Sequence, residues 1–323
     1  MPNPSSAPTD NPQPLQVLQV ADVPPEPEGQ PAWLVEHLWA RQAVGVLGGA
    51  PKTCKTFMAL EMALAVASGT PCLGRFRVAD PGPVLVFAAE DDPVQICARL
   101  RGLAQARDID FQTLPIFLIV AAQLRLDRSR DLTYLTQAVD ALRPRLLILD
   151  PLVRLHRLQE NSAQEISALL ADLRTLQRRF SLAVLLVHHT RKTNGPASGQ
   201  DLRGSGDVHA WSDSSLYLHG LHDQLRLTGE HRAARAPEPV ALTLIGTPPH
   251  LEVDASPPPA QHRDLPQRVL EVFRHLAGPI TQPQLRDLLK VRNQSLTGVL
   301  RQLRIDGKIA RAHDGWTLPA EPH

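Results

Sequence analysis

The sequence predicts an α/β fold in which helices cover both faces of a mostly parallel sheet. Short apolar runs alternate with amphipathic stretches from about residue 33 to residue 254. A glycine-rich turn joins the first apolar run to a segment of good helix formers, and polar residues follow the ends of several later runs. Strand–helix alternation favours a parallel sheet, because a parallel crossover needs a connection about as long as a helix.

The apolar runs predict six strands, at residues 43–48, 84–89, 116–121, 145–149, 182–187 and 214–219. Helical spacing predicts helices over 93–106, 130–142 and 163–179, and residues 57–68 are rich in Ala, Met and Leu. The later segments 224–229, 240–245 and 250–253 are predicted to be short antiparallel strands at the edge of the sheet.

Composition limits the class of protein. A chain of 323 residues can hold one large domain and a small one, and its formal charge of +1 gives no general basic field that would require nucleic acid. Cys54, Cys72 and Cys97 form no C-x-x-C pair, which fits a reducing compartment. We find neither an apolar stretch of membrane-spanning length nor a signal peptide, so we expect a cytoplasmic protein without membrane contact.

Residues 44–56, VGVLGGAPKTCKT, predict a phosphate-binding loop between a strand and a helix. The usual pattern, G-x-x-x-x-G-K-[ST], has a second glycine where this chain has Cys54. Backbone N–H groups at a helix N-terminus can surround phosphate oxygens, while Lys55 reaches the β- and γ-phosphates and Thr56 binds Mg²⁺. The predicted loop consists of Gly49, Ala50, Pro51, Lys52, Thr53, Cys54, Lys55 and Thr56.

Cys54 leaves a second interpretation open, in which the segment is an ordinary Gly-Pro turn between a strand and a helix. Glycine at this position permits close backbone approach and an unusual φ angle, and cysteine gives up part of that freedom. Because cysteine is small, we expect weakened nucleotide affinity rather than an abolished site.

Acidic and histidine residues follow three of the predicted strands. Glu90-Asp91-Asp92 follows the second strand, Asp150 the fourth, and His188-His189 the fifth. Ligands of open parallel sheets bind beyond the carboxyl ends of the strands, so these groups are expected at the same edge as the phosphate loop.

Each of these positions has a chemical and a structural interpretation. Asp150 can hold the hydration shell of Mg²⁺, Glu90 can orient or deprotonate an attacking water, and a histidine can hydrogen-bond the γ-phosphate. An acid after a strand is also a common helix cap, which is the favoured interpretation for Asp91 and Asp92 before the helix over 93–106. A lone histidine is commonly a surface residue.

With these motifs the chain resembles RecA/DnaB-superfamily ATPases, in the branch of RepA-type hexameric helicases and related bacterial AAA family ATPases. The resemblance runs from about Trp33 to Asp254. It rests on the motifs WLVEHL, GGAPKTCKT, FAAEDD, LILDPLVRLH, VHHTRK and DLRGSGDVHAWSD. It implies a RecA-like ATPase domain over 32–254 that uses ATP and Mg²⁺.

The resemblance also implies roles for single residues. Glu90 matches the catalytic glutamate, Asp150 the acid near Mg²⁺, and His189, with His188 beside it, the sensor of the γ-phosphate. Lys55 and Thr56 match the loop lysine and the Mg²⁺ ligand, and Lys52 matches a lysine often found in the loop. Members usually form hexamers in which a neighbour supplies an arginine to the ATP; Arg232 is preferred for this role and Arg203 is the alternative.

The remaining regions flank this domain. Residues 1–31 contain nine prolines and are expected to form a disordered tail, and residues 255–263 form a stiff linker. Residues 264–323 are predicted to form a winged helix-turn-helix, with helices near 265–276, 282–289 and 294–303, a turn at Asp306-Gly307 and a hairpin. The third helix would present Asn293, Gln294, Ser295, Thr297 and Arg301 to DNA.

From residue 263 onward ten basic and six acidic residues give a net charge of +4, which is compatible with phosphate contacts and does not require them. A unit of this kind can equally bind protein.

We therefore expect an ATP-hydrolysing, DNA-associated protein, such as a RepA-like replicative helicase. As a homo-hexamer it would take single-stranded DNA through the ring, duplex DNA on the winged helix, or both. An ATP-dependent DNA-binding switch without unwinding activity is the alternative, and a non-hydrolysing nucleotide-binding scaffold is a third interpretation.

Overall fold

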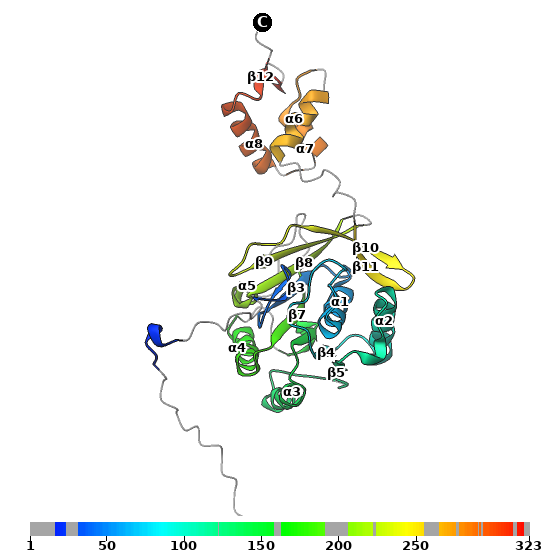
Figure 1. The fold of residues 1–323 in the computed structure, drawn as a ribbon. Helices are drawn as coiled ribbons and strands as arrows, with labels where there is room; N and C mark the ends of the chain where they lie inside the picture. Colours follow the sequence, from blue (N-terminus) through cyan, green and yellow to red (C-terminus); the bar gives the residue numbers. More distant parts are fainter. Residues whose placement is uncertain are drawn as a thin grey trace, which may run out of the picture. The chain divides into compact units, whose positions relative to one another are not determined.

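The fold is described from a computed structural model. It describes residues 17–23, 32–121, 123–157, 163–190, 206–221, 224–254, 265–275, 278–289, 291, 293–312 and 315–319. The chain forms two compact units (Figure 1). One comprises Met1–Pro239 and Leu244–Glu252, and the other comprises Val240–Thr243 and Val253–His323. No helix among the described residues is long and apolar enough to cross a membrane.

Among the described residues, nine strands form one mixed sheet in the order β11-β10-β9-β8-β3-β7-β6-β4-β5. The strands are β3 (Val44–Gly49), β4 (Val84–Ala88), β5 (Ile116–Leu118), β6 (Leu146–Asp150), β7 (Ala183–His189), β8 (Ser214–Leu221), β9 (Gln224–His231), β10 (Val240–Gly246) and β11 (Pro249–Val253). Strands β8 to β5 in this order are parallel, and β9 pairs antiparallel with β8. The prediction of a mostly parallel sheet is confirmed.

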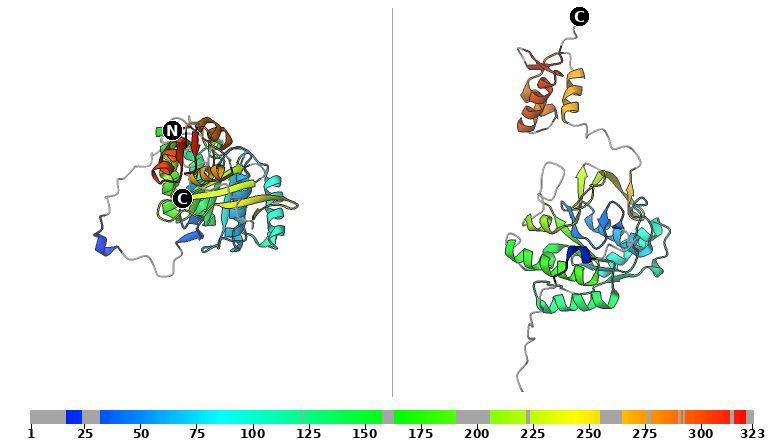
Figure 2. Two further views of the ribbon diagram at one scale, coloured as in Figure 1. Left: turned by 90° about the horizontal axis from the view of Figure 1, so that it is seen from above. Right: turned by 60° about the vertical axis from the view of Figure 1, so that its left-hand side comes forward.

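Helices cover both faces of the sheet, as Figure 2 also shows. Helix α1 (Lys55–Ser68) packs on β3, β4, β6 and β7 and against α2 (Pro93–Ala106). Helices α3 (Ser129–Leu142), α4 (Ala163–Phe180) and α5 (Gly206–Trp211) cover the other face, where α4 contacts α3, α5 and β7. The predicted helices match the bounds of α1 to α4 within two residues. The sequence did not predict α5, which is too short to show a helical period.

The face under α4 forms a continuous aliphatic core. Every second residue of β3, such as Val44 and Val46, points into this core, and so does every second residue of β4, β6 and β7, as the pleat of a strand requires. Helix α4 contributes apolar side chains at helical spacing: Ile166, Leu169, Leu170, Leu173 and Leu176. Each such burial contributes roughly 1.5–3 kcal/mol, so this mainly aliphatic face, with Phe87 and Tyr217 among its buried residues, supplies much of the stability.

The central strand β3 is packed closely on both sides. A Cβ atom at Gly45 would come within 1.6 Å of the Ser214 carbonyl oxygen, so only glycine allows β8 to pair here. Before β3, the chain forms a small antiparallel pair, β1 (Trp33–Val35) and β2 (Trp39–Ala40), which the sequence did not predict. Ala40 N–H donates to Ser214 Oγ at 3.1 Å, which attaches this pair to the start of β8.

Most of the predicted proline-rich tail and linker lies outside the described residues. Within the tail, Val20–Asp22 form a single 3-10 turn, η1, in which no side chain is buried. Two further 3-10 turns, η2 (Phe111–Thr113) and η3 (Leu152–Arg154), follow α2 and β6. Strand β5 ends at Leu118, three residues earlier than predicted.

The C-terminal unit contains α6 (Leu265–His275), α7 (Gln282–Leu289), α8 (Asn293–Ile305) and an antiparallel pair, β12 (Ala310–Ala312) and β13 (Gly315–Thr317). Its core includes Val269, Phe273, Leu285, Leu300 and Leu303. Gly307, at φ 68°, makes the turn after α8 that the Asp-Gly pair predicted.

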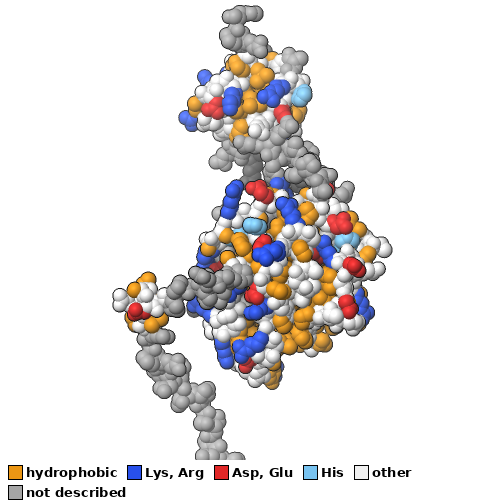
Figure 3. All heavy atoms as spheres, viewed as in Figure 1, with side chains coloured by type: hydrophobic (Ala, Val, Ile, Leu, Met, Phe, Trp, Pro, Cys, Tyr) orange, Lys and Arg blue, Asp and Glu red, His pale blue; other side chains and the backbone are white. Residues whose placement is uncertain are grey.

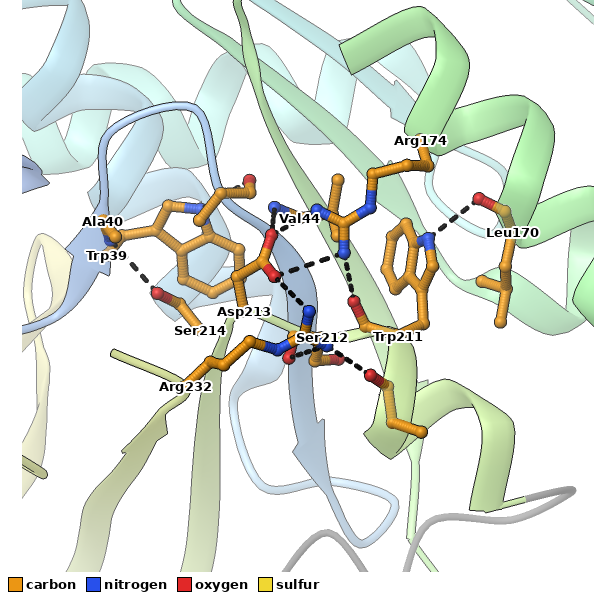
Figure 4. A network of polar contacts seen from close by, with 12 residues as sticks. Trp39, Ala40, Val44, Leu170, Arg174, Trp211, Ser212, Asp213, Ser214 and Arg232 are labelled. Atoms are coloured by element: carbon orange, nitrogen blue, oxygen red, sulfur yellow. Dashed lines mark hydrogen bonds and ion pairs between the residues drawn. The ribbon is translucent and has the colours of Figure 1, made fainter. Parts of the chain in front are cut away.

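A network of polar contacts joins the amino ends of β3 and β8 to α4 and β9 (Figure 4). Asp213 accepts a hydrogen bond from Val44 N–H at 3.3 Å and pairs with the guanidinium groups of Arg174 and Arg232. Arg174 also donates to the Trp211 carbonyl oxygen and lies 5.7 Å above the Trp211 ring. One carboxylate therefore holds four elements together.

We predict that Asp213→Ala lowers the free energy of unfolding by about 2 kcal/mol, because two arginines and one backbone N–H lose their acceptor in a partly buried setting. Urea denaturation measures the change. Asp172→Ala on the exposed side of α4 is the control, with an expected change below about 0.5 kcal/mol. Equal effects of the two substitutions would contradict the structural role of Asp213.

Candidate nucleotide-binding site

The phosphate loop predicted from the sequence lies between β3 and α1. A Cβ atom at Gly49 would come within 2.6 Å of Thr53 Oγ1 and 2.7 Å of the Leu218 carbonyl oxygen, so the loop requires glycine there. Thr53 Oγ1 donates to the Ala50 carbonyl oxygen at 2.8 Å and closes the turn. The loop therefore has a fixed shape, and its backbone leads into the N-terminus of α1.

Cys54 caps α1 in the left-handed conformation, with φ 59° and ψ 26°. This is the position at which the usual motif has glycine, and the conformation explains that preference, because a left-handed backbone costs a residue with a side chain roughly 1–2 kcal/mol. Lys52 has φ 67° as well. The loop thus contains two side-chain-bearing residues in a conformation that glycine adopts without strain.

Lys55 is buried at the start of α1, and its Nζ donates to the Ala50 carbonyl oxygen at 2.7 Å. Burial lowers the pKa of its ammonium group, while the negative charges of Asp150 and Glu90 act in the opposite direction. The ammonium group therefore lies at the centre of the loop, directed at the space that the loop encloses.

Thr56 and Asp150 meet at the floor of the same space. Thr56 Oγ1 donates to Asp150 Oδ2 at 2.8 Å. Asp150 is 8% exposed, and burial raises the pKa of its carboxyl group to about 6, with neighbouring Asp91 acting in the same direction. A cation bound beside these two oxygens would remove the cost of ionising a buried acid.

The three acids after β4 have different partners. Glu90 Oε1 accepts from Arg154 Nε at 2.8 Å. Asp91 forms a bidentate ion pair with Arg99 of α2, in which the two guanidinium nitrogens donate to Oδ2 and Oδ1 at 2.7 and 3.0 Å. Asp92 caps α2 by accepting from Val94 N–H at 2.7 Å. The helix-cap interpretation is confirmed for Asp92 and is wrong for Asp91, whose side chain turns toward Arg99.

The two histidines at the end of β7 lie in different surroundings. The parallel register of β3 and β7 places His188 opposite Gly48 and His189 opposite Gly49. His188 is 2% exposed, whereas His189 lines the cavity at the loop. Of the two, His189 is therefore the one placed to meet a phosphate group.

These residues enclose a cavity of about 350 Å³. Its lining consists of Lys52, Thr53, Cys54, Lys55, Thr56, Phe57, Ala88, Glu90, Asp91, Arg99, Asp150 and His189. The volume lies in the range of small-molecule sites. The sequence did not predict Arg99 and Phe57 as site residues, because their place in the lining depends on the packing of α2 on α1.

The donor set of this cavity fits Mg²⁺. Among the described residues no group of three His, Cys, Asp or Glu side chains could hold a metal ion alone. Mg²⁺ usually keeps several waters and binds one or two carboxylates together with substrate phosphates. Thr56 and Asp150 offer one hydroxyl and one carboxylate beside the phosphate loop, which is the arrangement that Mg²⁺ bound to a nucleotide uses.

Of the two arginines considered as a finger, Arg203 is outside the described residues, and Arg232 does not line this cavity. Arg232 follows β9, whose register pairs His231 with Ser214, at the edge where the parallel strands begin. The phosphate loop lies at the opposite edge, after Gly49, so the sheet separates Arg232 from the loop of its own chain.

Comparison with known proteins identifies the family. A family model described as "AAA domain" matches residues 9–195, more than half of the chain. The chain belongs to this family. The match begins within the proline-rich tail and ends just after β7, so it includes the phosphate loop and all three strand ends with acids or histidines.

Comparison with solved structures shows a fold shared with a DnaB-like helicase. A DnaB-like replicative helicase, described together with its interactions with primase, matches with a TM-score of 0.52 at 16% identity, over 66% of this chain and 57% of the helicase chain. This chain therefore spans less than two thirds of that helicase. A RadB recombinase matches at 0.49 and 16% identity, over 66% of this chain and 92% of its own.

A KaiC-like protein from the archaeon Pyrococcus horikoshii matches with a TM-score of 0.48 and 17% identity, over 68% of this chain and 93% of its own.

We predict that Cys54→Gly binds a fluorescent ATP analogue several-fold more tightly than the wild type, because glycine has no Cβ atom and lets phosphate approach the backbone more closely. Fluorescence titration with Mg²⁺ measures the affinity. Cys54→Ala keeps a Cβ atom and is the matched control, for which we expect no gain. Unchanged affinity in the glycine variant would refute the role of Cys54.

We also predict a pH dependence of stability that Asp150 causes. Its carboxyl pKa is raised to about 6 in the folded state, so the native chain binds the proton more tightly than the unfolded chain. The stability this contributes is present at low pH and is lost as the pH rises toward and through 6, so the free energy of unfolding should be higher at pH 5 than at pH 7 by about 1 kcal/mol.

Urea denaturation without nucleotide or Mg²⁺ tests this pH effect. Asp150→Asn cannot titrate at this position, so the difference in stability between pH 5 and pH 7 should shrink by the same amount. An identical pH profile in both proteins would show that the Asp150 carboxyl has an ordinary pKa.

Proposed function

We propose that this protein hydrolyses ATP at the cavity beside β3 and couples hydrolysis to DNA, as a replicative helicase or a related ATPase. The observation that carries the proposal is the convergence of Lys55, Thr56, Glu90 and Asp150 in one cavity at the carboxyl ends of the parallel strands. Membership of the AAA-domain family and the RecA-like fold support the ATPase activity.

In this proposal each side chain of the cavity has its own role in phosphoryl transfer. Lys55 binds the β- and γ-phosphates, and Glu90 orients the attacking water and accepts its proton. Thr56 and Asp150 would hold Mg²⁺, which supplies charge neutralisation between the phosphates when bound. His189, beside the loop, contacts the γ-phosphate and responds to its loss. The remaining loop residues, Gly49 to Cys54, offer backbone N–H groups to the phosphate oxygens.

An arginine from a second copy completes the site in this scheme, and the position of Arg232 at the opposite edge of the sheet supports that arrangement. Arg232 is engaged within its own chain by Asp213 and by the carbonyl oxygen of Ser212 at 3.4 Å. Its guanidinium would therefore leave these partners to reach a neighbour. A head-to-tail homo-hexamer accommodates such a contact in every subunit.

The C-terminal unit is proposed to be a winged helix that contacts duplex DNA. Three helices followed by a two-stranded antiparallel pair support this, with Ile280 bridging to Trp316. The exposed side of α8 carries Arg301, Arg304 and, just beyond it, Lys308. The visible face of this unit in Figure 3 shows basic side chains with some acidic ones among them, which fits moderate affinity.

A second candidate function is an ATP-dependent switch that binds DNA without unwinding it. The modest charge of the C-terminal unit is compatible with both. A motor requires DNA-stimulated hydrolysis and a ring, whereas a switch requires only a DNA affinity that changes with the bound nucleotide.

The first experiment measures ATP hydrolysis with and without single-stranded DNA. We predict that Lys55→Ala and Glu90→Gln each reduce turnover by at least about 100-fold, because one loses the phosphate ligand and the other the group that orients water. Binding of a fluorescent ATP analogue should be lost in Lys55→Ala and kept in Glu90→Gln. A Lys55→Ala protein with the wild-type rate would overturn the proposed site.

The response to DNA separates the two candidates. Strong stimulation of the wild type that Glu90→Gln abolishes supports a motor and leads to an unwinding assay. Hydrolysis that does not respond to DNA favours the switch. A wild type without any hydrolysis contradicts the motor and leaves a switch that works by nucleotide binding alone or a nucleotide-binding scaffold.

A further inference from the structure

The ion pair between Glu90 and Arg154 links the predicted water-orienting acid to a residue that has no role in the scheme above. Arg154 Nε donates to Glu90 Oε1 at 2.8 Å, and the two side chains are about half exposed, 60% for the arginine and 47% for the glutamate. The residues lie 64 positions apart in the sequence, at the ends of the neighbouring strands β4 and β6.

Glu90 itself stands on an exposed turn. Strand β4 ends at Ala88, and Ala89 N–H donates to the Asp150 carbonyl oxygen at 2.7 Å, which is the last backbone contact with β6. Among the described residues, Arg154 is the hydrogen-bond partner of the Glu90 carboxylate, through Oε1. Without Arg154 the side chain would be free to sample several rotamers.

Arg154, by contrast, starts from a rigid support. It belongs to η3, whose Leu152 and the following Leu155 are buried in the core under α3 and α4. The guanidinium of Arg125 donates to the carbonyl oxygens of Arg154 and His156, at 3.1 and 2.7 Å. Arg125 N–H in turn donates to the buried Asp131 carboxylate at 2.9 Å. The backbone that carries Arg154 is therefore held from both sides.

We propose that Arg154 is a positioning residue for hydrolysis, which holds the Glu90 carboxylate toward the phosphate loop through one oxygen. The second oxygen, Oε2, is left to accept a hydrogen bond and then the proton of the attacking water. The inference rests on the proposed ATPase function and assigns a residue to it.

The free energy that the Glu90–Arg154 ion pair contributes to folding differs from its expected effect on the rate of hydrolysis. A half-exposed ion pair contributes little to stability, typically below 1 kcal/mol, so its loss should leave the fold intact. Misplacement of a catalytic group by about 1 Å can, however, reduce a rate by up to two orders of magnitude. An effect on turnover without an effect on stability or nucleotide binding is thus the signature of this role.

The test is a double-mutant cycle on the full chain. We expect Arg154→Ala to lower kcat about 10-fold, with KM for ATP, the affinity for a fluorescent ATP analogue and the melting temperature unchanged. Arg154→Lys keeps the charge and loses the planar guanidinium, so it should restore part of the rate. In a Glu90→Gln background, measured by single-turnover hydrolysis, Arg154→Ala should change nothing further.

Several outcomes would overturn the inference. An unchanged or increased kcat in Arg154→Ala, or an equal loss in the Glu90→Gln background, shows that Arg154 does not act through Glu90. A parallel fall in nucleotide affinity and melting temperature indicates a structural role. If the wild type hydrolyses ATP and only the cycle fails, the proposed function stands; if the wild type is inactive, both fall.

Discussion

The parallel register of β4, β6, β7 and β3 is the constraint on which the site depends. Hydrogen bonding aligns Ala88 with Asp150 and Gly49 with His189, so the carboxyl ends of four strands reach one edge together. A shift of one residue in any pair would turn the polar group that follows into the aliphatic core, because side chains alternate between faces. The chemistry of the cavity is thus set by backbone pairing and enforced by the burial of Val, Leu and Ile on both faces.

The same sheet separates two polar clusters, one at the phosphate loop and one around Asp213. Phosphate-binding groups gather where the parallel strands end, and the Asp213 network with its two arginines lies where β3 and β8 begin. Strand β3, buried along its whole length, runs between these two edges, and the proposed function uses one edge for the nucleotide and the other for a second chain.

Much of the fold follows from local sequence, and the failures have physical causes. Helix α2 begins and ends where apolar spacing and the cap at Asp92 place it, and α7 matches its predicted bounds of 282–289. The strand pair β1–β2 was missed, because two or three residues show no period and its stability comes from Trp39, which is fully buried, and from Ser214, far along the chain. Residues 119–121 were predicted to belong to β5 because they continue its apolar run, but the strand ends at Leu118.

Some residues of the candidate site could likewise be predicted from local sequence, and others could not. Lys55, Thr56 and Asp150 could be placed from the order of motifs, because a strand, a loop and a helix fix them locally. The glycine position of the motif, here Cys54, could also be expected to need a left-handed backbone. The pairing of Asp91 with Arg99 and of Glu90 with Arg154 could not be predicted, since each depends on a partner that tertiary packing brings into reach.

The hydrogen bonds within the loop have a thermodynamic consequence. Lys55 Nζ donates to the Ala50 carbonyl oxygen and Thr56 Oγ1 donates to Asp150, so a nucleotide and a metal ion bound here would replace these partners. Binding becomes an exchange of contacts in which the gain in free energy is the difference between new and old bonds. Under the proposed function, such an exchange would lower the affinity for nucleotide and so favour release of the product after each hydrolysis.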